Sequence, residues 1–159
     1  MSADKLIVTL EKLLKLHENL YEVTLQKTEL LKHDRVDELK ELLKKEQMFI
    51  QAIKQVEEER IMQTIDFLGN INELTLSACI EKSTGIEKEK LELIRNKFTA
   101  VINELKDRNK LNKELTKQAI QLTSVTLDMI MPQESDINYN KPTNKSTEKQ
   151  RRSIFDSKA

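Results

Sequence analysis

The chain has 159 residues, enough for one domain or an elongated bundle. Its 27 basic and 27 acidic residues give a formal net charge of zero, which argues against a nucleic-acid binder, because such a protein needs basic surface to neutralise phosphates. No apolar run approaches the roughly 20 residues that cross a bilayer, so we expect no membrane insertion.

Composition favours long helices. Only 2 Gly and 2 Pro occur, 34% of the residues are charged and 4% are aromatic, which is typical of an all-α protein with a thin core of aliphatic side chains. The single Cys79 excludes an intramolecular disulfide and suits a reducing compartment. The first residues show no apolar signal-peptide stretch, so we expect a cytoplasmic protein.

The first two helices are predicted at about 3–31 and 35–68. Ser2 is the expected N-cap of the first helix and Asp34 that of the second. A connection as short as His33-Asp34 makes the two helices an antiparallel hairpin.

Two further helices follow a break at Gly69, which fits the position just after a helix. Asn70 and Glu73 have the spacing of a capping box and predict a third helix at about 71–82.

Thr84 and Glu87 repeat that capping-box spacing and predict a fourth helix at about 85–130. The whole is then an elongated antiparallel hairpin or bundle with coiled-coil character, occupying residues 1–131.

The last helix carries the most regular apolar stripe, with a 3-4 spacing typical of a seam against another helix. Arg108, Asn112 and Thr126 interrupt it, and polar residues in a seam can fix its register. Part of this seam is the predicted groove for a helix of another protein, with these contacting residues: Leu91, Ile94, Phe98, Val101, Leu105, Leu115 and Leu122.

The residues from 132 to 159 are rich in Ser, Asn, Lys and Thr and keep no apolar period. Such a segment buries too little surface to order itself, so we expect a disordered tail. Tyr139, Ile154 and Phe155 are large apolar exceptions that favour either a short binding motif or chance.

No catalytic or metal site is predicted. His17 and His33 are the only histidines, and neither has the spacing of a metal-binding pair. Cys79 has no nearby histidine, and two glycines cannot build a phosphate loop. We therefore expect neither an enzyme nor a cofactor.

Two other features have competing interpretations. Arg60 continues an apolar seam of the second helix, which predicts a partly buried position beside an acid. Met48, Met62, Met129 and Met131 are either ordinary core residues or an adaptable binding surface, because methionine repacks around different partners.

The hairpin carries a family resemblance. The short acidic turn at Asp34-Arg35, Lys45-Glu46 and, further along, Glu59-Arg60 resemble the core of the FlgN family of flagellar export chaperones. Tyr139-Asn140 and the final 154–159 segment are similar to the C-terminal end of Gram-positive members, although Lys141-Pro142 stands where their spacer often begins with Gly.

The resemblance implies a cytoplasmic, non-enzymatic chaperone of flagellar type III export. It implies that the chain binds C-terminal segments of the hook–filament junction proteins FlgK and FlgL and passes them to the export-gate protein FlhA. In that interpretation Tyr139, Ile154 and Phe155 help to dock the gate. The alternative is a structural coiled-coil scaffold that self-associates without a client, and the sequence leaves the oligomeric state open, a homo-oligomer included.

Overall fold

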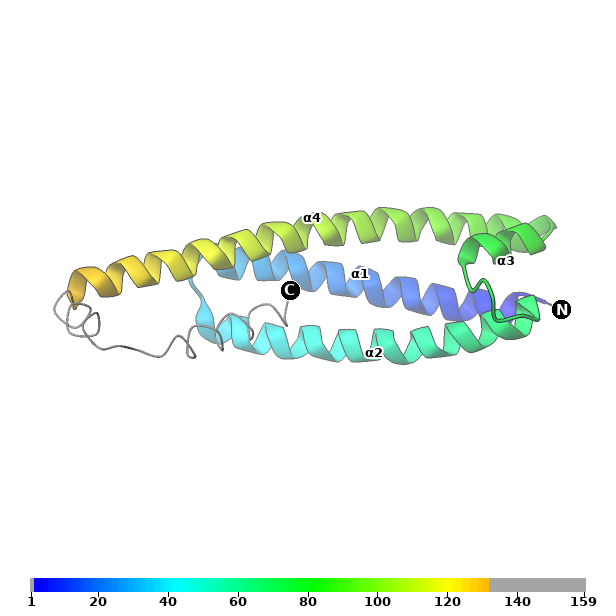
Figure 1. The fold of residues 1–159 in the computed structure, drawn as a ribbon, viewed down its shortest axis with the longest axis horizontal. Helices are drawn as coiled ribbons and strands as arrows, with labels where there is room; N and C mark the ends of the chain where they lie inside the picture. The colour runs from blue at the N-terminus through cyan, green and yellow to red at the C-terminus, as the bar shows by residue number, and fades with distance from the viewer. Residues whose placement is uncertain (1, 132–159) are drawn as a thin grey trace, which may run out of the picture. The chain divides into compact units, whose positions relative to one another are not determined.

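A computed structural model describes residues 2–131 of the chain. These residues form helices and no strand, which confirms the predicted all-α class (Figure 1). The structure divides into two compact units, Met1–Lys117 and Gln118–Ala159. The helices are α1 (Asp4–Lys32), α2 (Val36–Leu68), α3 (Leu76–Lys82) and α4 (Gly85–Ile130).

Helices α1 and α2 form the expected antiparallel hairpin. Lys27 pairs with Glu46 at 3.3 Å near the turn, and Lys12 approaches Glu59 at 4.0 Å further from it. Residues earlier in α1 thus meet residues later in α2.

The predicted cap of α2 is wrong by one residue. Arg35 is its N-cap, while Asp34 takes the left-handed conformation with φ 53° and makes the turn tight. Aspartate tolerates that conformation better than most residues, because its short polar side chain can bond locally.

The end of α2 is confirmed at Gly69, which has φ 74° and donates its N–H to the carbonyl of Ile65 at 2.7 Å. A side chain of α3 also caps this C-terminal end of α2. Lys82 Nζ donates to the carbonyls of Phe67 and Leu68, two of the last acceptors that a helix leaves unpaired.

The predicted start of the third helix at 71 is wrong, since α3 begins at Leu76. The side chain of Asn70 accepts from the N–H of Asn72 and makes a turn instead of a helix start. Thr75 is the true N-cap, because its hydroxyl accepts from the N–H of Ala78 at 3.1 Å.

The predicted cap of α1 also needs correction. Ala3, not Ser2, is the N-cap, and it has no side-chain cap of its own. Glu87 supplies the acceptor from α4, binding the N–H of Ala3 at 2.9 Å and the hydroxyl of Ser2 at 3.1 Å. Glu87 therefore satisfies the end of another helix rather than closing a local box with Thr84.

Within the first unit, α4 runs parallel to α1. Ala3 meets Glu87 at the start, the ring of His17 meets that of Phe98, and Thr24 meets Asn112 towards the other end. Side chains bridge the two helices along this line, whereas α1 and α2 approach closely through their backbones.

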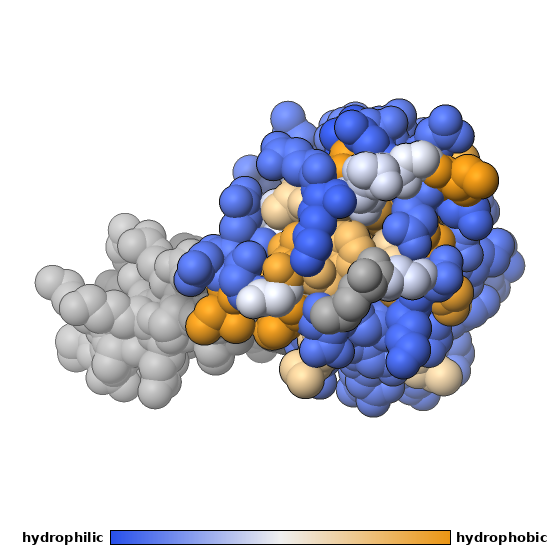
Figure 2. Space-filling model, turned by 90° about the vertical axis from the view of Figure 1, so that its right-hand side faces the viewer, coloured by the Kyte–Doolittle hydropathy of each residue, from blue (hydrophilic) through white to orange (hydrophobic). Residues whose placement is uncertain are grey.

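The main core lies where α1 begins and α2 ends. Apolar side chains from all four helices gather there, ringed by hydrophilic ones (Figure 2). Its buried members are Ala3, Leu6, Ile7, Leu10, Phe67, Cys79, Ile80, Leu91 and Ile94.

The boundary between the two units falls after Lys117, inside α4, and the predicted division of the chain at residue 131 stays a prediction. The predicted disordered tail, 132–159, lies outside the described residues.

Candidate binding surface

The seven predicted client-contacting residues divide into three groups. Leu91, Ile94 and Leu105 are buried, each at most 6% exposed. Phe98, Val101 and Leu115 are half-buried, and Leu122 is 66% exposed.

The buried members support the fold. Leu91 and Ile94 belong to the main core, and Phe98 packs against that core. The Phe98 ring also meets the ring of His17 edge-on, with centroids 5.4 Å apart. His17 Nδ1 lies 2.8 Å from the carbonyl oxygen of Leu13, so its polar group is used inside α1. A client could cover the buried Leu91 and Ile94 only if the bundle opened.

Asn112 has the register-fixing role that an interruption in a seam suggests. Its side chain is 3% exposed, donates to the carbonyl of Thr24 at 3.0 Å and accepts from the hydroxyl of Thr28 at 2.6 Å. A buried amide needs such partners, because an unpaired polar group inside a protein is costly. Sliding α4 along α1 by one turn would break both bonds.

The described part of the second unit, residues 118–131, is different, and we call it the α4 terminal segment. Asp128 is its only charged residue. Its large apolar side chains are all exposed, including Met129 at 78%. They are Ile120, Leu122, Val125, Leu127, Met129, Ile130 and Met131.

Helical positions explain why this segment resembles a binding surface. Leu122 and Met129 continue the seam of α4, while Ile120 and Leu127 lie seven residues apart on another face. A helix that is apolar on more than one face is normally buried. Contiguous apolar surface on an otherwise polar protein commonly marks an interaction site.

Sequence reasoning did not include Ile120, Val125, Leu127 and Ile130 among the candidate residues, because it followed a single stripe. The low content of charged residues in this part of the sequence would have identified them. Charged residues make up 34% of the chain, yet only Asp128 is charged between 118 and 131. Met129 and Met131 are exposed here, as a binding surface requires.

Arg60 is partly buried beside an acid, as predicted. Its guanidinium binds both carboxylate oxygens of Glu57, at 2.6 and 2.8 Å, and donates to the carbonyl of Leu74 at 3.2 Å. The hydrogen bond to Glu57 is the main reason that the pKa of Arg60 is raised. These contacts hold the loop before α3 against α2. The role of Arg60 is therefore structural.

Cys79 is 1% exposed and lies in the main core. Burial raises the pKa of its thiol, although the positive charge of Arg60 opposes that shift. A buried thiol that keeps its proton is a poor nucleophile. Cys79 therefore behaves as a small core side chain.

Residues 2–131 hold no group of three His, Cys, Asp or Glu side chains arranged to bind a metal ion. None of the four helices is long and apolar enough to cross a membrane. Tyr139, Ile154 and Phe155, the predicted gate-docking residues, lie outside the described residues.

Comparison with known proteins adds two matches. The family described as "FlgN protein" matches residues 1–147. A Bacillus subtilis (strain 168) protein described as "Uncharacterized protein YvyG" is 42% identical over 160 residues, covering 100% of both chains. No solved structure matches the chain significantly.

Proposed function

Because the chain belongs to the FlgN family of flagellar export chaperones, we propose that it binds C-terminal helical segments of FlgK and FlgL. In this proposal it works in the cytoplasm and delivers these hook–filament junction proteins to the export-gate component FlhA. Its chemistry is binding alone, without catalysis or a cofactor.

The observation that supports client binding is the exposed α4 terminal segment. A client helix with apolar side chains at helical spacing could cover Leu122, Val125 and Met129. Fully burying one such side chain is worth about 1.5–3 kcal/mol. A few of them offset the several kcal/mol that association and ordering of the client cost.

Methionine suits a chaperone with two clients. Met129 and Met131 have unbranched, polarizable side chains, and both are exposed. Such side chains repack around partners of different shape. This property supports one surface that accepts segments of both FlgK and FlgL.

The alternative function is a structural coiled-coil scaffold, in which the α4 terminal segment pairs with a second copy of the chain. Light scattering after gel filtration separates the two. A chaperone should take up client segments in a fixed ratio, whereas a scaffold should show a constant mass whether or not they are added.

Calorimetric titration of the full chain with C-terminal segments of FlgK and FlgL tests the proposal. Leu122→Asp should weaken binding on the order of tenfold or more, because one buried leucine accounts for more than 1.4 kcal/mol. Val8→Asp is the matched control, since Val8 is an apolar residue of α1 with a similar exposure of 64%. Equal affinity of the two variants, or no binding by the native chain, would contradict the proposal.

We assign gate docking to Tyr139, Ile154 and Phe155, on the basis of the family resemblance. A full-length chain in which all three are changed to Ala should bind client segments with unchanged affinity. Cells that carry this variant should secrete less FlgK and FlgL. Lost client affinity would instead place these residues in the client site.

A further inference from the structure

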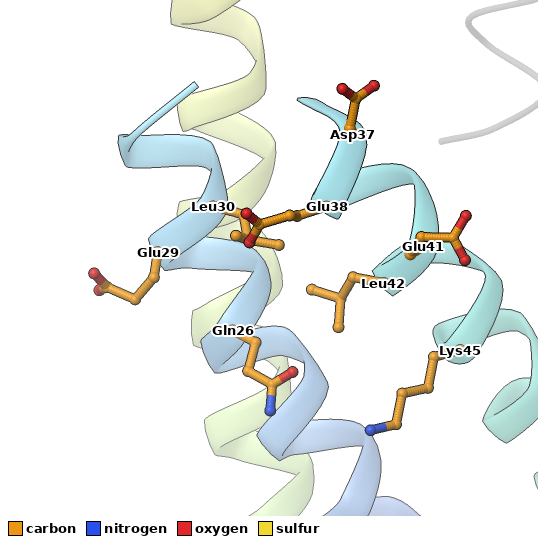
Figure 3. A pocket seen from close by; sticks show the side chains of 8 residues that line it. All are labelled: Gln26, Glu29, Leu30, Asp37, Glu38, Glu41, Leu42 and Lys45. Atoms are coloured by element: carbon orange, nitrogen blue, oxygen red, sulfur yellow. The ribbon is translucent and has the colours of Figure 1, made fainter. Parts of the chain in front are cut away.

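A groove with a volume of about 720 Å³ opens between α1 and α2, next to the turn that joins them (Figure 3). Leu30 from α1 and Leu42 from α2 point into the space between the two helices. Leu42 is only 8% exposed, and Leu30 is half-buried. The floor of this hairpin groove is therefore apolar and formed within the hairpin.

The rim of the hairpin groove is acidic. Glu29 from α1 and Asp37, Glu38 and Glu41 from α2 line it, against the single basic residue Lys45. Among the residues that the structure describes, Asp37 makes no ion pair. An apolar floor with carboxylates along its edge fits a peptide that places arginines beside large apolar side chains.

The other three rim carboxylates already have basic neighbours, but these pairs are weak. The two residues of each pair are three positions apart in the sequence, with both side chains about half exposed or more, and exposed pairs of this kind contribute little stability. An incoming guanidinium could replace them at small cost. The pairs are Glu29 with Lys32, Glu38 with Arg35, and Glu41 with Lys44.

We propose that the hairpin groove binds the C-terminal segment 151–155 of the same chain. This segment reads Arg151-Arg152-Ser153-Ile154-Phe155. The two arginines complement the rim carboxylates, and the adjacent Ile154 and Phe155 have the size and character to cover Leu30 and Leu42. Since residues 149–158 carry four basic side chains and one acidic one, the charge of the segment opposes that of the rim.

The chain is long enough for this contact. In the first unit, Thr28 binds Asn112 at 2.6 Å, so the groove floor at Leu30 lies two residues along α1 from a point held against α4. From Asn112 to its end at Ile130, α4 covers about 27 Å at 1.5 Å per residue. The linker 132–150 can extend over about 60 Å, so it can bring residue 151 back whatever direction α4 takes after Lys117.

If this contact forms, the hairpin groove and the export gate compete for the same residues of the tail. Ile154 and Phe155 cannot contact the groove floor and the export gate at the same time. If the gate-docking role in the proposed function is right, the hairpin groove holds these residues until the gate displaces them. The docking itself does not depend on that function and can be tested without client or gate.

Methyl NMR of the full chain tests the docking. The double variant Ile154→Asp/Phe155→Asp should shift the Leu30 and Leu42 methyl signals. The matched control Ile137→Asp/Tyr139→Asp, which makes a similar change elsewhere in the tail, should leave them in place. If the methyl signals of Leu30 and Leu42 do not shift in the variant Ile154→Asp/Phe155→Asp, the proposal is overturned.

A charge exchange tests the rim. Arg151→Glu/Arg152→Glu should lower the ratio of docked to free tail on the order of tenfold, since each exposed pair is worth up to about fivefold. Adding Glu38→Arg/Glu41→Arg should restore the native signals, while Glu58→Arg/Glu59→Arg, exposed acids further along α2, should not.

Rescue by both acid pairs would show general charge attraction and would contradict a specific groove. Spectra that change with dilution would place the segment in the groove of a second copy, which also overturns docking within one chain.

Discussion

Two parts of one helix behave in opposite ways. Between Leu91 and Asn112, α4 has buried seam positions that meet α1 and the main core. Between 118 and 130 the same helix exposes every large apolar side chain that it carries. The apolar spacing is similar in both parts, so the difference does not come from the spacing.

In the first of these parts, α1 supplies the cover. The side chains of α1 that meet α4 end near Thr28, which binds Asn112, and α1 itself ends at Lys32. A 3-4 apolar spacing therefore predicts that an interface exists, but not whether its partner is in the same chain. Where the first unit supplies a partner, as α1 does for Asn112, the seam becomes core.

The largest expected effect comes from a charge in the covered part. Leu91→Asp should unfold the first unit, because Leu91 is 0% exposed and burying an unpaired carboxylate costs about 4 kcal/mol or more. Circular dichroism during thermal unfolding measures this loss. If the Leu91→Asp variant unfolds at the same temperature as the native chain, the seam near Leu91 is accessible. The contrast between a buried and an exposed part of α4 would then be wrong.

Features that depend on neighbours in sequence were predictable. The hairpin follows from a short turn, and the end of α2 follows from Gly69, because local sterics decide both. Capping boxes were less informative. Glu73 does not open a helix, and Glu87 binds the start of α1, 84 residues away.

Long-range pairing could not be derived from the sequence. Nothing in the spacing of α4 specifies that it lies parallel to α1, with Asn112 against Thr24 and Thr28. For the same reason the seam residues could be identified while their division into core and surface could not. The charge-poor stretch from 118 to 131 was the one signal in the sequence that distinguishes the exposed part.

Asn112 allows a test of the covered part with a smaller effect. Asn112→Ala should lower the free energy of unfolding by about 1–3 kcal/mol, because Thr24 and Thr28 lose a buried partner. Asn109→Ala is the control, since Asn109 is exposed on the same helix and undergoes the same gain in helix propensity. Urea unfolding measures both, and equal stabilities would show that the parallel register does not depend on Asn112.

Cys79 adds a pH test of the main core. Burial raises the pKa of its thiol, so the folded chain keeps a proton that the unfolded chain loses near pH 8.5. This contribution to stability is fully present below that pH and is lost as pH rises through the folded pKa. The stability advantage of the native chain over Cys79→Ala should therefore shrink above about pH 8.5. An advantage that grew with pH would mean that Arg60 outweighs burial.

The smallest expected effect is in the uncovered part. Leu122→Asp should change the free energy of unfolding by less than about 0.5 kcal/mol, because Leu122 is 66% exposed and exposed substitutions rarely matter more. Thermal unfolding in the absence of client measures this, with Leu105→Asp as the buried counterpart in the same seam. If Leu122→Asp destabilised the free chain as strongly as Leu105→Asp, a second copy or the rest of the chain would have to cover the α4 terminal segment. That result would favour the scaffold over the chaperone, since a surface that is already covered in the free protein is not accessible to a client.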